Sequence, residues 1–145
     1  MELVAIGREP LANSQQRGVK MRDYTKIQAW ILSDNLAVEI YKRTQDFPHD
    51  ERYALTSQVR RAAYSVAANI SEGSGRRTTK DFVRFLDMAM GSANEVRYFC
   101  HLAHRLGYIE DSTYASLKER VESVCKCLSA YIRAVEKDVL FPAKG

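Results

Sequence analysis

Apolar residues recur at alternating steps of three and four positions along most of the chain, which is the period of an amphipathic α-helix. The series is most regular after about Asp111, where it forms an uninterrupted heptad pattern: Tyr114, Leu117, Val121, Val124, Leu128, Tyr131 and Val135. No comparable segment shows the apolar-polar alternation of a half-buried strand. We therefore expect an all-α protein.

Three earlier segments have the same period. They run from about Thr25 to Thr44, from near Asp50 to Gly73, and from Thr78 to Gly107. All three prolines of the chain lie outside the helical segments, as expected because proline interrupts the hydrogen bonds of a helix. Gly73 and Gly107 can close their helices, with Gly73 in the left-handed conformation that often follows a helix. Thr78 to Asp81 match a capping box that opens the third helix.

Four helices joined by short connections must pack against their neighbours in the chain. The predicted architecture is an antiparallel up-down-up-down four-helix bundle that occupies residues 24–140. Residues 1–23 have no helical period and contain glycine, proline and asparagine, so we expect an irregular, flexible N-terminal arm. Residues 141–145 are a short C-terminal tail. With 145 residues, the chain has room for one such domain and no second one of useful size.

Two features of the helical segments predict close packing against neighbours. The first segment carries a second apolar stripe beside its main one, formed by Ile27, Ile31, Val38 and Tyr41. The two stripes together are wider than one core needs, so we expect burial on two sides, with another subunit as the second. In the third segment, Gly91 stands where glycine is less favourable than alanine by about 1 kcal/mol. Close approach of a neighbouring helix is the simplest compensation.

Composition restricts the cellular setting. No apolar run approaches the roughly 18 residues that span a bilayer, and the N-terminus has no apolar segment of a secretory signal. The three cysteines are an odd number, and Cys125 and Cys127 would point to different faces of a helix. We expect a cytosolic protein with reduced thiols and no membrane partner.

The net charge of +4 is unevenly distributed along the chain. Residues 60–84 contain six basic and two acidic side chains, whereas residues 85–145 contain eight of each. The positive surplus therefore lies around the junction between the second and third helices. The basic residues there, which are the candidate nucleic-acid-binding residues, are Arg60, Arg61, Arg76, Arg77, Lys80 and Arg84.

The junction, residues 69–78, has the composition of a phosphate-binding segment. Two glycines, paired arginines and the start of a helix would supply backbone N–H groups, guanidinium groups and a favourable helix dipole. The alternative, a helix hairpin loop whose charges are simply solvated, is equally open. A nucleoside-triphosphate loop is excluded, since the pattern G-x-x-x-x-G-K-[ST] is absent.

Arg60 and Arg61 need separate interpretations. They lie about 100° apart around the second helix, so at most one of them can face the same way as the junction arginines. The other is expected to form an internal ion pair with Glu72 or Glu95, since an arginine on a bundle face usually has a carboxylate partner.

Neither a metal site nor a catalytic site is predicted. His101 and His104, with Cys100 beside them, resemble part of a helical metal site, but the Glu-x-x-His pattern of bundle metal sites is absent. No serine or cysteine is placed beside a base in a recognisable nucleophile motif. The carboxylates alternate with basic residues at helical spacing, which is typical of surface pairing. We expect no enzyme activity, no metal and no cofactor.

Several short motifs carry a resemblance to a known family. They are Leu55-Thr56-Ser57-Gln58, Arg60-Arg61-Ala62, Asn69-Ile70 with Glu72-Gly73, and Gly91-Ser92-Ala93 with Glu95. Over about Tyr24 to Leu140, the chain resembles the bacterial four-helix bundle family named for proteins encoded in 23S ribosomal RNA intervening sequences. The same superfamily resembles the accessory variability protein of diversity-generating retroelements.

The resemblance implies a four-helix bundle that assembles into a ring-shaped homopentamer with a basic surface suited to RNA or DNA. In the retroelement branch it also implies a reverse transcriptase as a protein partner. It implies no catalytic residues, and the basic positions that match are Arg60, Arg61 and Arg76. The leading hypothesis is therefore a non-enzymatic homo-oligomer that binds nucleic acid. The alternative is a protein-interaction scaffold or accessory subunit without direct nucleic-acid contact.

Overall fold

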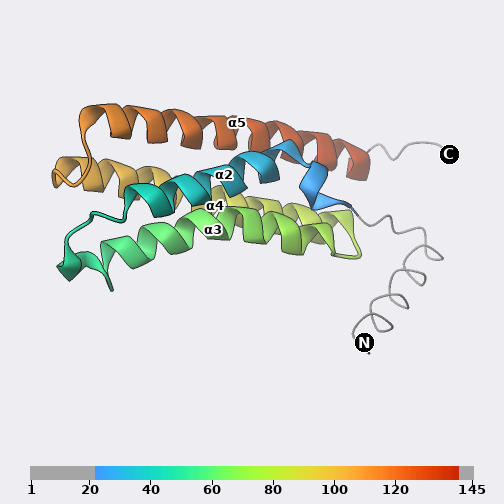
Figure 1. Ribbon diagram of the computed structural model, residues 1–145. Helices are drawn as coiled ribbons and strands as arrows, with labels where there is room; N and C mark the ends of the chain where they lie inside the picture. Colours follow the sequence, from blue (N-terminus) through green and yellow to red (C-terminus); the bar gives the residue numbers. More distant parts are fainter. Residues whose placement is uncertain (1–21, 141–145) are drawn as a thin grey trace.

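The computed structural model describes residues 22–140, in which four long helices predominate (Figure 1). The helices are α2 (Gln28–Arg43), α3 (Leu55–Ser74), α4 (Thr79–Arg105) and α5 (Asp111–Leu140). Short 3-10 turns, η1 (Tyr24–Lys26) and η2 (His49–Glu51), precede α2 and α3. No strand occurs within residues 22–140, so the predicted all-α fold is confirmed for this part of the chain. The predicted arm up to residue 21 and the predicted tail, residues 141–145, lie outside the described residues.

Each long helix packs against two others. α3 contacts α2 and α4, and α5 contacts α4 and α2, so the four helices surround one core. Figure 1 shows consecutive helices running in opposite directions along a common axis. The α3–α4 connection and η1 therefore lie at one end of the bundle, which we call the junction end. The α2–α3 and α4–α5 connections lie at the other end, which we call the loop end.

The core is built by the apolar stripes that the sequence pattern predicts. On α5 the heptad positions Leu117, Val121, Val124, Leu128 and Val135 are buried. Full burial of an aliphatic side chain of this size stabilises a fold by about 1.5–3 kcal/mol. α3 and α4 contribute similar buried stripes, so apolar contact between helices holds the bundle together. Within the described part of the chain, no helix combines the length and the apolar character that a bilayer-crossing segment requires.

The chain covers only part of the wide apolar surface of α2. Ser33, Ile40 and, just after the helix, Thr44 are buried, and Ile27 of the second stripe joins them. Val38, farther along the second stripe, remains 50% exposed, and the stripe ends in a half-exposed tyrosine. Burial of the remaining surface against another subunit stays a prediction.

The second helix begins later than expected. The segment after Pro48 forms the turn η2, and Ala54 has a non-helical backbone with φ −120° and ψ −106°. α3 therefore starts at Leu55, whose N–H donates to the Glu51 carboxylate at 3.0 Å. That hydrogen bond satisfies one of the free donors at the helix N-terminus. The predicted start near Asp50 is wrong, because the chain turns before α3 forms.

Gly73 does not close α3 in a left-handed conformation, so that prediction is wrong. The helix continues through Ser74, and Gly75 caps it with φ −89°. Gly73 instead lies buried where α3 meets α4. A Cβ atom at this position would lie 2.6 Å from Cβ of Phe85 and 2.9 Å from Cδ1 of Phe82. The missing side chain therefore lets the two helices approach closely.

The predictions for two glycines, Gly91 within the third helix and Gly107 after it, have different outcomes. Gly107 follows α4 with φ +77°, in the left-handed region, which confirms the predicted end of that helix. Gly91 lies exposed on α4, and a Cβ atom there would meet none of the described residues within 4 Å. The predicted close approach of a neighbouring helix at Gly91 is therefore wrong within this chain, because the close α3–α4 contact occurs at Gly73.

Candidate nucleic-acid interface

The α3–α4 connection is a short turn tied to both helices. Backbone N–H groups of Gly75 and Arg76 donate to carbonyls in the last turn of α3, at 3.2 and 3.0 Å. Thr78 caps α4, and its hydroxyl oxygen accepts a hydrogen bond from the N–H of Asp81 at 3.1 Å. Thr78 is therefore the N-terminal cap of α4, as the capping-box motif predicts. The turn thus holds the basic residues of the junction in defined positions.

Arg76 and Arg84 are both held on the ring of Phe85. Their guanidinium carbons lie 4.4 and 4.7 Å from the ring centroid, within the range of cation–π contacts. Arg76 pairs with Glu72 at 2.8 Å and more loosely with Asp81 at 3.7 Å. Arg84 pairs with Asp81 at 2.9 Å. Two carboxylates therefore match these two arginines, which add little net charge to the junction.

Arg77 and Lys80 carry the uncompensated charge of the junction. Both are exposed, and neither forms an ion pair within residues 22–140. They lie at the N-terminus of α4, where the helix dipole is positive and the first N–H groups have no partner within the helix. Anions bind favourably at such a position.

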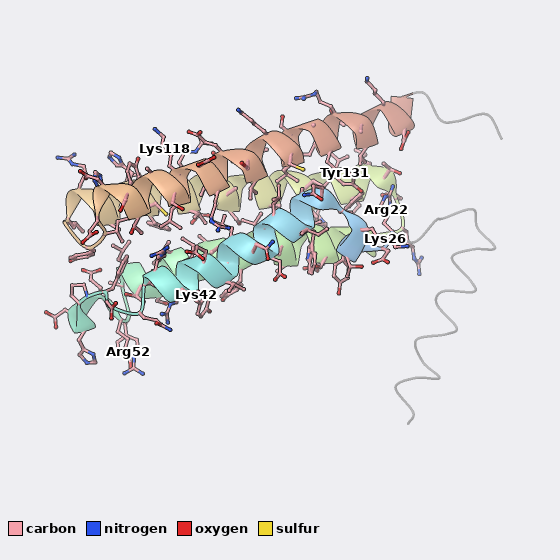
Figure 2. All side chains as sticks on the ribbon, turned by 45° about the horizontal axis from the view of Figure 1, so that its top comes forward. Arg22, Lys26, Lys42, Arg52, Lys118 and Tyr131 are labelled. Carbon is pink, nitrogen blue, oxygen red and sulfur yellow. The ribbon has the colours of Figure 1, made fainter. Side chains whose placement is uncertain are left out.

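Two further basic residues, Arg22 and Lys26, lie at the junction end (Figure 2). The guanidinium carbon of Arg22 lies 4.4 Å from the centroid of the Phe82 ring, and the group donates to the Thr79 hydroxyl at 3.2 Å. Burial raises the pKa of the Tyr131 phenol, and the charge of Arg22 opposes that shift. Arg22 and Lys26 could not be assigned to this end from the sequence, because they are far from the junction along the chain and only folding brings them to it.

Arg60 lies elsewhere and has a structural role. About four helical turns, roughly 21 Å at 1.5 Å per residue, separate it from the end of α3, and Arg76 lies beyond that end. Its guanidinium carbon lies 4.6 Å from the centroid of the Tyr41 ring. The group donates to the Thr44 hydroxyl at 2.8 Å and to the Tyr41 carbonyl at 3.3 Å, where a cation suits the C-terminus of α2. The predicted carboxylate partner is wrong for Arg60, because these α2 oxygens take its place.

Arg61 faces a polar groove between α3 and α4, with a volume of about 230 Å³, which we call the α3–α4 groove. The groove is lined by Gln58, Arg61, Ala62, Ser65, Asn69, Ser92 and Glu95. Neither Arg61 nor Glu95 forms an ion pair with any residue of the described range 22–140. The structure therefore gathers four of the six candidate residues at the junction end and places Arg60 and Arg61 away from them.

His104 and Cys100, near the end of α4, contribute to the fold. Nε2 of His104 lies 2.6 Å from Oδ1 of Asp111, and its ring stacks on Tyr114 with a centroid distance of 4.4 Å. These contacts join the end of α4 to the start of α5. Burial raises the pKa of the Cys100 thiol to about 12, so this thiol stays protonated at neutral pH. Among residues 22–140, no three metal-ligating side chains gather in a group that could hold a metal ion.

Comparisons with known proteins point to one family. The family model for the 23S rRNA-intervening sequence protein matches residues 25–130, which is more than half of the chain. A protein of unknown function from the S23 ribosomal protein family of Bacteroides thetaiotaomicron VPI-5482, with a crystal structure at 1.70 Å resolution, is similar with a TM-score of 0.67. The two sequences are 26% identical, and the match covers 72% of this chain and 95% of that one. No curated protein matches the chain. Sequence and fold together show that the chain belongs to the 23S rRNA-intervening sequence protein family.

Proposed function

We propose that this chain is a non-enzymatic, self-associating helical bundle that binds nucleic acid at its junction end. The observation that carries the proposal is a group of cations around the N-terminus of α4. Arg77 and Lys80 come from the junction, and Arg22 and Lys26 come from the segment that leads into α2. Arg77, Lys80 and Lys26 are exposed.

Phosphate groups suit this surface for two physical reasons. The N-terminus of α4 favours an anion through its dipole and its free N–H groups. Guanidinium and ammonium groups from two segments of the chain add charge-assisted hydrogen-bond donors. Because the cations come from separate segments, a ligand with several phosphates can use more of them than a ligand with one. A nucleic-acid strand is such a ligand.

Self-association would multiply this surface. The family resemblance implies five copies in a ring, and each copy would contribute one junction end. Counterion release grows with the number of phosphates contacted, so several junction ends on one strand bind much more tightly than one. We propose RNA as the first ligand to test, since the family description names 23S rRNA. The proposed location is the cytosol.

RNA affinity measured at several salt concentrations tests the proposal. The variant Arg77→Glu/Lys80→Glu reverses two junction charges. The control Lys42→Glu/Lys118→Glu makes the same change in net charge at two exposed residues far from the junction end (Figure 2). Each lost contact to single-stranded RNA lowers the salt slope by about 0.7, so the junction variant should lose about 1.4 of the slope and about tenfold or more in affinity.

The control should retain nearly the wild-type affinity and slope. Equal losses in the two double variants would mean that RNA responds to net charge alone. No loss in the junction variant would remove the junction end as the binding site. Arg76 and Arg84 are left unchanged in this experiment, because their contacts with Phe85 also support the fold.

A second candidate function is a protein-interaction scaffold or accessory subunit, with a reverse transcriptase as the partner that the retroelement resemblance implies. Apolar side chains left exposed at the loop end favour it: Tyr53 is 86% exposed and Leu106 is 50% exposed. Purification of the tagged protein from native cell extract, with and without nuclease, separates the two functions. A partner protein that remains bound after nuclease digestion supports the scaffold, whereas retention that requires intact nucleic acid supports the first proposal.

A further inference from the structure

The α3–α4 groove is a hydrogen-bonding surface that the chain itself scarcely uses. Its polar side chains are one arginine, one carboxylate, two amides and two hydroxyl groups, namely Arg61, Glu95, Gln58, Asn69, Ser65 and Ser92. One amide N–H of Asn69 donates to the Ser65 carbonyl at 2.8 Å. The two charged groups are exposed, and within residues 22–140 they have no ion-pair partner. The groove therefore offers both a cation and an anion to a partner.

The charges of the groove select its occupant. A strand of nucleic acid carries only negative charge, so its phosphates would attract Arg61 and be repelled by Glu95. An occupant that suits the groove brings one carboxylate and one cation, at about the same separation as Arg61 and Glu95. A second copy of this chain brings this set, because its groove holds the same two charges.

We propose that two copies of the chain pack groove to groove about a two-fold axis that runs along the groove. The proposal goes beyond the self-association proposed above, because it adds a two-fold contact between copies to the contacts of the implied ring. Such an axis keeps the direction of the helices and exchanges the two sides of the groove, so α3 of one copy lies against α4 of the other. Arg61 of each copy then meets the partner's Glu95 in two equivalent ion pairs. An axis across the groove would instead bring α3 against α3 and like charges together.

The same arrangement accounts for the exposed glycine of α4. Tyr64 lies three residues after Arg61, and Gly91 lies four residues before Glu95, so both lie about one turn nearer the junction end. When Arg61 meets the partner's Glu95, Tyr64 is therefore level with the partner's Gly91. Tyr64 is 48% exposed, and Gly91 leaves open space above the α4 backbone. Glycine admits the tyrosine ring at this position, where a large side chain would obstruct it.

This contact differs from the contact that closes a ring. A ring joins two different faces of neighbouring copies head to tail, whereas the groove contact joins the same face of two copies and closes at two. The implied ring of five and the groove-to-groove pair are therefore separate properties, and substitutions in the groove test the pair alone.

Exchange of charge between two single variants tests the contact. Arg61→Glu places two carboxylates at each contact, and Glu95→Arg places two guanidinium groups there. Each variant alone should pair about tenfold or more weakly than wild type in sedimentation equilibrium. An equimolar mixture of the two variants again has one acid and one base at each contact, so its pairing should return to within a few-fold of wild type. Mixing cannot restore an ion pair that forms within one chain.

Substitutions at Gly91 give an independent test that changes no charge. Gly91→Leu should weaken pairing about tenfold or more because the side chain fills the space proposed for Tyr64, and Gly91→Ala should weaken it far less. Both variants should fold, since a Cβ atom at this position meets none of the described residues within 4 Å. Circular dichroism confirms folding before association is measured.

The outcomes separate this inference from the proposed function. A mixture that pairs no better than its two components would overturn the groove contact. Wild-type association that none of these substitutions alters would also overturn it, while self-association would stand. A wild-type protein that stays monomeric at every concentration would overturn both. An Arg61→Glu variant that loses RNA affinity but keeps its pairing would assign the groove to nucleic acid and overturn the contact between copies.

Discussion

The inner face of α4 packs against the other helices of the chain, whereas several residues of its outer face are exposed. The inner face is buried, and its packing includes Gly73 of α3, whose missing side chain leaves room for Phe85. The outer face carries Met88, 47% exposed, Tyr98, 57% exposed, and a glycine without a neighbour among the described residues. Features that a chain leaves without internal partners are the ones to examine for contacts with other molecules. On α4, that comparison directs attention to the outer face of the helix.

The largest expected difference between the two faces is in core stability. Leu86 is fully buried on the inner face, so Leu86→Ala should lower the free energy of unfolding by about 2–5 kcal/mol. Met88 lies two positions later on the outer face, and Met88→Ala should change it by no more than about 0.5 kcal/mol in the monomer. Urea unfolding at low protein concentration measures both. Similar values for the two variants would break the distinction between the faces.

A smaller loss is expected at Gly73. Gly73→Ala places a methyl group 2.6 Å from Cβ of Phe85, so α3 and α4 must move apart. Overpacking of this kind costs about 1–3 kcal/mol, and the helix preference for alanine returns up to about 1 kcal/mol, so the net destabilisation should reach about 2 kcal/mol. Thermal and urea unfolding compare the variant with wild type. An unchanged or raised stability would show that the two helices adjust without strain.

The buried thiol of Cys100 should make the inner face sensitive to alkaline pH. Burial raises its pKa from 9.0 to about 12, so the folded state binds the proton more tightly than the unfolded state. The resulting stability is fully present below pH 9 and is lost as pH rises toward 12, with a loss of about 1 kcal/mol by pH 10. Unfolding measured from pH 8 to pH 10 should show this loss in wild type and a shallower dependence in Cys100→Ala. Parallel curves for the two proteins would contradict the prediction.

The smallest expected effect has the opposite sign. Gly91→Ala adds a methyl group to an exposed helix position without a described neighbour, so it should stabilise the monomer by up to about 1 kcal/mol. Unfolding measured at low protein concentration isolates the effect. The two alanine variants together distinguish the two glycines. Gly73 lies at a helix contact inside the chain, whereas Gly91 lies on an exposed surface. Destabilisation at both positions would remove that contrast.

Local patterns predicted the features that depend on neighbouring residues. The apolar period of α5 yields its buried stripe, and the hydroxyl of Thr78 caps α4 where the motif indicates. Gly107 takes the left-handed conformation that ends α4. Helix periodicity, capping and glycine conformation involve residues a few positions apart, so they are visible before tertiary packing is known.

Features that depend on contacts between helices were predicted poorly. Gly73 was expected to end a helix, but it lies within α3, where Phe85 of the next helix leaves no room for a side chain. Arg60 was grouped with the junction by its place in the sequence, yet its contacts are with the end of α2. Arg22 and Lys26 showed no pattern that would join them to the junction. In each case the deciding contact is between residues far apart in the chain.

The sequence by itself determined that residues 22–140 form helices around an apolar core, because the spacing of apolar side chains is a property of each segment. Only the tertiary structure decided which charges remain available. Arg76 and Arg77 are neighbours with the same side chain, but Arg76 is held by Phe85, Glu72 and Asp81, whereas Arg77 is exposed. Neutralisation depends on distances of a few ångströms between side chains, and those distances arise only when the helices pack.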